Sequence, residues 1–131
     1  MPEPRIILVE DDPQDEFFFR RAWSKAGLSG ALDVMRDGEE LVNGLDAVSL
    51  GAAQHPCLVV LDSVVKPLST TEVCAAIDKL PRHIPIVLLS GAQDSPLQRS
   101  LCRSRLVRSL SKPIDAETLK EVVRENCPEL M

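Results

Sequence analysis

The stretch Cys57-Leu58-Val59-Val60-Leu61-Asp62 decides the fold of this chain. Five apolar residues in a row are typical of a strand that is buried on both faces of a parallel sheet, and an acid follows them. Two other apolar runs also end in polar residues. Ile6–Val9 is followed by Glu10-Asp11-Asp12, and Ile86–Leu89 is followed by Ser90. We therefore expect several buried strands that each deliver a polar group to one edge of a sheet.

Segments with a helical period alternate with these apolar runs, which predicts βαβ units around a parallel sheet. The expected strands are Ile6–Val9, Leu32–Met35, Cys57–Leu61, Ile84–Leu89 and Leu106–Leu110. The last of these is interrupted by polar residues, which an edge position would tolerate. The helices are expected after Asp12-Pro13, after Asp37-Gly38, at the capping boxes that open at Ser69 and Ser95, and after the cap Asp115.

The carboxyl ends of parallel strands form the crevice in which such sheets place their sites. Glu10, Asp11, Asp62, Ser90 and Lys112 would meet there. Carboxylates, a hydroxyl and an ammonium suit a divalent cation and a phosphoryl group, with Asp62 as the nucleophile. Each residue alone also has a plain structural explanation: a strand-end turn, an acid at a helix start or a solvated lysine.

The composition indicates one domain over residues 1–131, with a net charge of −5 that argues against a nucleic-acid partner. No apolar run is long enough to span a membrane, and the start lacks a secretory pattern. Cys57, Cys74, Cys102 and Cys127 are widely spaced and form no CxxC pair. We expect buried free thiols in a reducing compartment, and hence a cytoplasmic protein, rather than disulfides or zinc.

The aromatic residues cluster in the first helix, where Phe17, Phe18 and Phe19 are consecutive and Trp23 follows. Three consecutive helical positions sweep about 200°, so at least one phenylalanine should be exposed. Further along, Arg99, Arg103, Arg105 and Arg108 form either a basic patch for an acidic partner or an ordinary solvated face.

Five segments together resemble the receiver domain of bacterial two-component response regulators over essentially the whole chain. They are Ile7–Pro13, Asp37–Glu40, Leu58–Asp62, Pro85–Gly91 and Ser111–Asp115. The resemblance implies a flavodoxin-like, doubly wound α/β fold with a five-stranded parallel sheet of order 2-1-3-4-5 and five flanking helices. The Glu-Asp-Asp-Pro opening is most similar to stand-alone receivers associated with bacterial phytochromes.

The resemblance also assigns roles to the polar strand ends. Asp62 becomes the phospho-accepting residue, and Mg²⁺ is expected at Glu10, Asp11 and Asp62, with position Val64 added to the metal site. Ser90 becomes the switch hydroxyl, and Lys112 pairs first with Asp62 and then with the phosphoryl group. The expected partners are a histidine kinase or histidine phosphotransfer protein and a downstream target protein. A homodimer is possible, and no nucleic acid or membrane partner is expected.

Some positions depart from the family pattern. Ser109 stands where an aromatic residue is usual, and the loop after Asp62 lacks the usual proline and glycine at Lys66 and Thr70. A degenerate receiver that acts as a phosphorylation-independent interaction module therefore stays open. Val64 and Ala92 cannot hydrogen-bond a hydrolytic water, so we expect a phospho-aspartate that hydrolyses slowly rather than a conventional enzyme. Val64 also disfavours a haloacid-dehalogenase-like phosphatase, and the acidic Glu10–Asp12 disfavours a flavin binder.

Overall fold

The computed structural model describes residues 5–28, 30–49, 55–62, 75–78, 84–90 and 106–130. Residues 75–78 are helical. The remaining elements are β1 (Arg5–Val9), α1 (Pro13–Lys25), β2 (Ala31–Met35), α2 (Gly38–Ser49), β3 (Leu58–Asp62), β4 (Ile86–Ser90), β5 (Leu106–Ser111), α5 (Ala116–Asn126) and the short 3-10 helix η1 (Pro128–Leu130).

The five strands form one parallel sheet of order β2-β1-β3-β4-β5, as expected. β5 lies at an edge, as its polar interruptions predicted, and its pairing with β4 shifts register between Ile86 and Val87. The expected capping boxes at Ser69 and Ser95 lie outside the described residues. Among the described helices, none is long and apolar enough to cross a bilayer.

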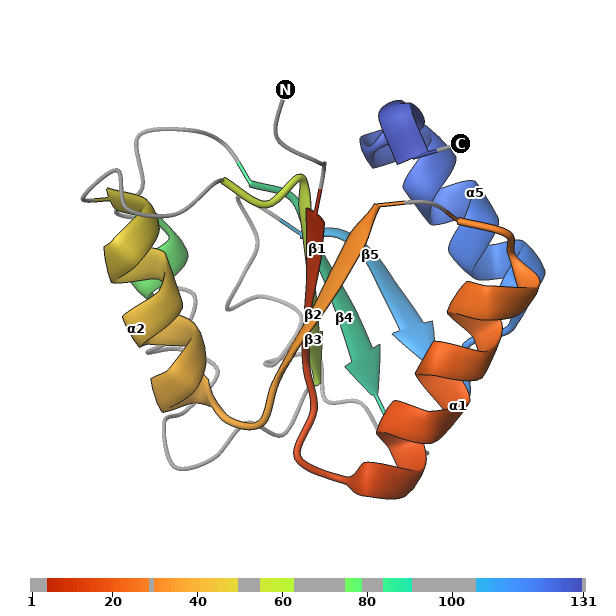
Figure 1. The fold of residues 1–131 in the computed structure, drawn as a ribbon, viewed down its shortest axis with the longest axis horizontal. Helices are drawn as coiled ribbons and strands as arrows, with labels where there is room; N and C mark the ends of the chain where they lie inside the picture. The colour runs from red at the N-terminus through yellow and green to blue at the C-terminus, as the bar shows by residue number, and fades with distance from the viewer. Residues whose placement is uncertain are drawn as a thin grey trace.

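Two helical layers enclose the sheet. α1 and α5 cover one face, and α2 covers the other, while the carboxyl ends of β4 and β5 point to the lower edge in the view of Figure 1. Alternate residues of each central strand enter opposite halves of the core: Ile7 and Val9 pack in the half near α2, and Ile6 and Leu8 pack in the other half. This burial on both faces explains why the central strands are continuously apolar.

The helix termini follow the sequence closely. Asp12 caps α1, because its Oδ1 accepts the backbone N–H of Gln14 at 2.8 Å, and Pro13 occupies the first helical position. α1 ends at Lys25 with Ala26 as its C-cap, and Gly27 follows with a φ of +68° in the left-handed region. At α5, Asp115 Oδ1 accepts the Thr118 N–H at 2.7 Å. These caps fix where α1 and α5 begin, directly beside the carboxyl edge of the sheet.

The cysteine prediction was wrong for one pair. Cys57, just before β3, and Cys127, at the end of α5, form a disulfide with their Cα atoms 5.9 Å apart. They are 70 residues apart in sequence, and only the packing of α5 on the sheet brings them together. Cys127 is fully buried, as expected. Cys74 and Cys102 lie outside the described residues.

Candidate functional site

Three acids gather at the carboxyl ends of β1 and β3. The strands pair in parallel with Val9 opposite Leu61, so Glu10 and Asp62, each one residue further on, emerge side by side. Asp11 follows Glu10. One carboxylate oxygen from each of the three acids lies within 4.8 Å of the others. Glu10 is 2% exposed and Asp62 is 8% exposed, whereas Asp11 is open to solvent.

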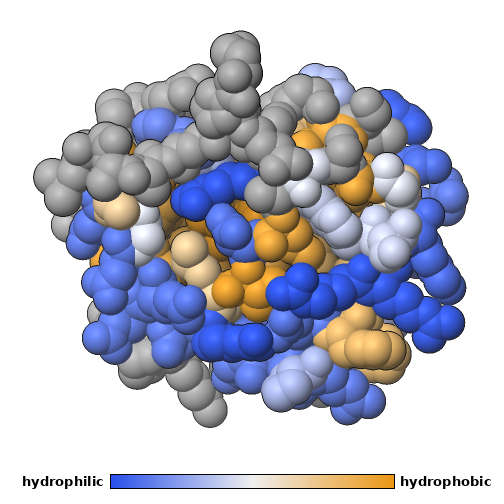
Figure 2. Space-filling view, viewed as in Figure 1, coloured by the Kyte–Doolittle hydropathy of each residue, from blue (hydrophilic) through white to orange (hydrophobic). Residues whose placement is uncertain are grey.

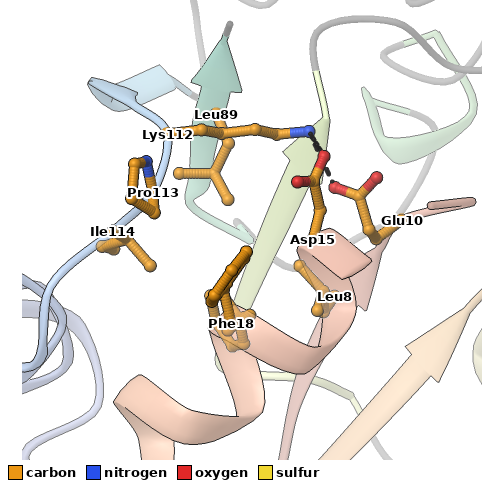
Figure 3. Close-up of a pocket in the computed structure, with 9 residues that line it drawn as sticks. Leu8, Glu10, Asp15, Phe18, Leu89, Lys112, Pro113 and Ile114 are labelled. Atoms are coloured by element: carbon orange, nitrogen blue, oxygen red, sulfur yellow. Dashed lines mark hydrogen bonds and ion pairs between the residues drawn. The ribbon is translucent and has the colours of Figure 1, made fainter. Parts of the chain in front are cut away.

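Lys112 reaches this acid cluster from the edge of the sheet that β5 forms. It follows β5, and its side chain extends past Leu89, as Figure 3 shows. Its Nζ lies 2.9 Å from Glu10 Oε2, 2.9 Å from Asp15 Oδ2 and 3.2 Å from Asp62 Oδ2. The ammonium of Lys112, which follows β5, therefore contacts three acids: one that follows β1, one that ends β3 and one in the first turn of α1.

The charges in this cluster change the titration of its members. Burial raises the pKa of Glu10 to about 7, and the negative charge of Asp62 adds to this rise, while Lys112 opposes it. Burial by itself would lower the pKa of Lys112. The hydrogen bonds to Asp15 and Glu10 and the charge of Asp62 outweigh it, so the Lys112 pKa is raised. Lys112 therefore stays cationic, and an additional cation nearby would favour the charged form of Glu10.

The donor set fits Mg²⁺. This ion prefers hard oxygen ligands, keeps several waters and needs only a few carboxylates from the protein. Glu10, Asp11 and Asp62 supply three carboxylates at an edge that solvent reaches through Asp11. Burial, with a smaller contribution from the charge of Asp62, raises the pKa of Glu10, so the ionisation of Glu10 is costly without a metal.

Two other expected site residues are Ser90, whose backbone the structure describes, and Val64. Ser90 ends β4, one residue beyond Leu89, which pairs with Asp62, so its backbone is at the same edge as the acids. Val64 lies outside the described residues. Ser109, at the position of the usual aromatic, lies half-buried on β5.

Asp15 was not among the site residues expected from the sequence. The structure directs its carboxylate to Lys112, 97 residues away in the chain. The available signal was the pattern Glu10-Asp11-Asp12-x-x-Asp15. Because Asp12 caps α1 at the carboxyl edge, an acid three residues later lies on the first turn beside the same crevice.

The surface of α1 next to the site is partly apolar. Phe17 is 60% exposed and Phe18 is 40% exposed, whereas Phe19 is 3% exposed and packs in the core, which confirms the expected exposure. Phe18 lines a hollow together with Lys112 and Asp15 (Figure 3). In the space-filling view of Figure 2, much of the face is hydrophilic, and apolar surface is visible in its middle, over the strands of Figure 1.

Of the four arginines in the expected basic patch, Arg108 is the one that lies within the described residues. Arg108 Nη2 lies 3.5 Å from Glu121 Oε1 on α5, so this arginine already has an acidic neighbour in its own chain. Arg99, Arg103 and Arg105 lie outside the described residues.

Comparisons with known proteins agree on the family. Residues 6–124 match the response regulator receiver domain family. The probable methanogenesis regulatory protein FilR2 of Methanothrix harundinacea (strain 6Ac) is 32% identical over 124 residues, which span 92% of this chain and 79% of that protein. The bacteriophytochrome response regulator AtBRR has the same fold, with a TM-score of 0.77 and 24% identity over 100% of this chain and 96% of that chain.

A third similar structure was solved with a metal. It is the receiver domain of the sensor histidine kinase PA1611 from Pseudomonas aeruginosa PAO1, with a magnesium ion coordinated in its active site cleft. It has a TM-score of 0.74 and 19% identity over 96% of this chain and 98% of that chain. The family match and the FilR2 similarity together show that this chain belongs to the response regulator receiver domains of two-component signalling.

Proposed function

We propose that the chain accepts a phosphoryl group on Asp62 from a phosphohistidine of a partner protein, in a reaction that depends on Mg²⁺. The observation that carries this proposal is the contact of Lys112 Nζ with Asp62 Oδ2 at 3.2 Å, inside a cluster of three acids that could hold a metal. A buried carboxylate that faces both a fixed ammonium and a cation site is equipped to take up a phosphoryl group.

In the transfer, a carboxylate oxygen of Asp62 attacks phosphorus and forms an O–P bond. The bond from phosphorus to the donor nitrogen breaks, and its electron pair leaves on the donor imidazole. Mg²⁺ held by Glu10, Asp11 and Asp62 would neutralise charge on the phosphoryl oxygens. Lys112 supplies a second, permanent positive charge, and we assign Ser90 as the hydroxyl that donates to the phosphoryl group afterwards.

Intact-mass measurement after incubation with acetyl phosphate and Mg²⁺ tests this proposal. Wild type should gain the mass of one phosphoryl group, and Asp62→Asn should gain none. Asp46→Asn, which removes an exposed acid on α2, is the matched control and should behave as wild type. Phosphorylation of Asp62→Asn at the wild-type yield would place the nucleophile elsewhere, and loss of phosphorylation in EDTA would support the metal requirement.

We propose that the donor protein docks on the exposed side of α1. Phe17 and Phe18 present apolar rings 5.8 Å apart in an edge-to-face arrangement, and Phe18 lines the same hollow as Lys112. Exposed aromatic residues are frequent anchors of protein interfaces. Phe18→Ala should slow transfer from a phosphorylated histidine phosphotransfer domain but not from acetyl phosphate. An equal loss with both donors would show that Phe18 supports the site and not the partner.

The second candidate is an interaction module that no longer needs phosphorylation. Ser109 favours it, because a serine cannot perform the movement of the aromatic side chain that is usual in the family. Under this alternative, binding of the downstream target would be the same for wild type and Asp62→Asn with acetyl phosphate present. A difference between the two proteins would support the phosphorylation-dependent switch instead.

A further inference from the structure

Asp15 contacts the site, and it is not the residue that caps its own helix. It lies in the first turn of α1, with its side chain 35% exposed. The cap of this helix is Asp12, whose carboxylate accepts the N–H groups of Gln14 and Asp15. The Asp15 carboxylate is therefore not the cap, and it points across the crevice to Lys112 Nζ at 2.9 Å (Figure 3).

We propose that Asp15 is a positioning residue for phosphoryl transfer, which holds the Lys112 ammonium beside Asp62 when a metal occupies the acid cluster. This inference rests on the proposed function, because Lys112 needs a fixed position only if charge develops on Asp62 and the incoming phosphoryl group.

Lys112 and a bound metal would compete for the carboxylate of Glu10. Its carboxylate contacts Lys112 at 2.9 Å and is also one of the three acids that could hold a metal. Asp62 has the same two neighbours. A divalent cation competes with Lys112 for both carboxylates. Asp15 is outside the three-acid cluster, so its contact with Lys112 is the one that the cation leaves in place.

Lysine is a flexible, point-like cation, and a small displacement of a catalytic group costs a large part of its effect. Without Asp15, the ammonium would be repelled by the incoming metal, and the partners left to it among the described residues would be Glu10 and Asp62, which the metal would also bind. With Asp15, the ammonium stays on the side of the crevice that faces α1. The expected effect is therefore on the rate of transfer at saturating donor and not on Mg²⁺ binding.

A purely structural role of Asp15 predicts other results. Acids in the first turn stabilise a helix by interacting with its positive end. Glu39 also lies in the first turn of its helix, α2, one position nearer the start than Asp15 is in α1, and it is exposed. Glu39→Gln is thus a matched control, because it removes the same kind of charge from the same kind of helix position without touching Lys112.

The first measurement is the rate of phosphorylation by acetyl phosphate at saturating Mg²⁺, followed by intact mass. Asp15→Asn should lower the rate at saturating donor roughly 3- to 10-fold, in line with the loss of one positioning contact, and leave the half-saturating donor concentration unchanged. Asp15→Glu should recover part of the rate, and Glu39→Gln should equal wild type. In a Lys112→Ala background, Asp15→Asn should have no further effect. A wild-type rate in Asp15→Asn, or an undiminished effect without Lys112, would overturn the proposal.

The second measurement does not depend on phosphorylation. The ¹H–¹⁵N NMR signal of the Lys112 ammonium should persist in wild type when Mg²⁺ is added, because Asp15 still holds it. In Asp15→Asn the signal should be present without Mg²⁺ and disappear or broaden with it. Persistence in both proteins would overturn the role of Asp15. If wild type took up no phosphoryl group while the signal behaved as expected, the proposed function would fail and the contact would stand.

Discussion

Replacing Glu10 by glutamine should stabilise the metal-free protein at pH 8. Glu10 is 2% exposed, and its folded pKa of about 7 exceeds the ordinary 4.5. At about 1.4 kcal/mol per pH unit, this interval corresponds to about 3.5 kcal/mol as an upper limit for the cost of ionising Glu10 in the folded state. We expect a gain of about 1–3 kcal/mol in the free energy of unfolding, or roughly 4 °C in Tm for each kcal/mol.

The substitution should remove little else. The glutamine carbonyl can still accept the Asp12 N–H, which lies 3.2 Å from Glu10 Oε1. Lys112 keeps its contacts with Asp15 and Asp62. The gain should therefore reflect the buried negative charge and not a change in packing.

The titration of Glu10 determines the direction in which the stability of the wild type changes with pH. Between pH 4.5 and about 7, the folded protein binds a proton at Glu10 that the unfolded chain has lost, so wild-type stability falls as pH rises through this window. Glu10→Gln lacks this titration. The two proteins should be similar near pH 4.5 and diverge up to about pH 7, with Glu10→Gln the more stable.

Urea unfolding in EDTA from pH 4.5 to 8, followed by Trp23 fluorescence, measures this difference. Glu39→Gln, which removes an exposed acid, should show the wild-type pH dependence. Adding Mg²⁺ should stabilise wild type more than Glu10→Gln, because the metal binds the folded state. Parallel curves for wild type and Glu10→Gln across this range, or a less stable variant at pH 8, would refute the electrostatic reasoning.

Three further outcomes are expected. Phe19→Ala should lower the free energy of unfolding by about 3–5 kcal/mol, because Phe19 is buried, whereas the exposed Phe17→Ala should change it by less than about 0.5 kcal/mol; similar losses in urea unfolding would contradict this packing. Reduction of the Cys57–Cys127 disulfide should cost about 4 kcal/mol by loop entropy, measured as urea midpoints with and without dithiothreitol, and Cys127→Ser should not respond to the reductant. An unchanged wild-type midpoint would argue against the cross-link. Phospho-Asp62 should decay slowly once the donor is removed, and Val64→Asn should accelerate the decay by positioning water; fast wild-type decay that Val64→Asn leaves unchanged would defeat this expectation.

Local patterns predicted the elements and the acids that the structure brings together after β1 and at the end of β3. Asp12-Pro13 and Asp115 gave the helix starts because capping is local chemistry, and the apolar runs gave the central strands because both their faces are buried. Each strand has boundaries that differ from the expected ones by one or two residues. The largest shift is at the strand expected from Ile84, which begins at Ile86, although the Pro85 carbonyl still accepts the Val59 N–H.

Long-range contacts could not be predicted in the same way. The strand order came from resemblance to a known family, and no local pattern pairs Asp15 with Lys112 or Cys57 with Cys127. These pairs are separated by 97 and 70 residues, and they meet only once α1 and α5 are packed on the sheet. Sequence reasoning identified the acids that end the strands, but not the acid that the neighbouring helix adds.

The disulfide links the start of β3 covalently to the end of α5. β3 begins beside Cys57 and ends at Asp62, and α5 starts shortly after Lys112 and ends at Cys127. The two elements therefore form a closed loop, which the Lys112–Asp62 ion pair completes at one end and a covalent bond completes at the other. A helix anchored covalently at its far end can pivot about that anchor but cannot slide along the sheet. If phosphorylation of Asp62 moves Lys112, we expect α5 to tilt, with the largest displacement near Ala116 and the smallest near Cys127.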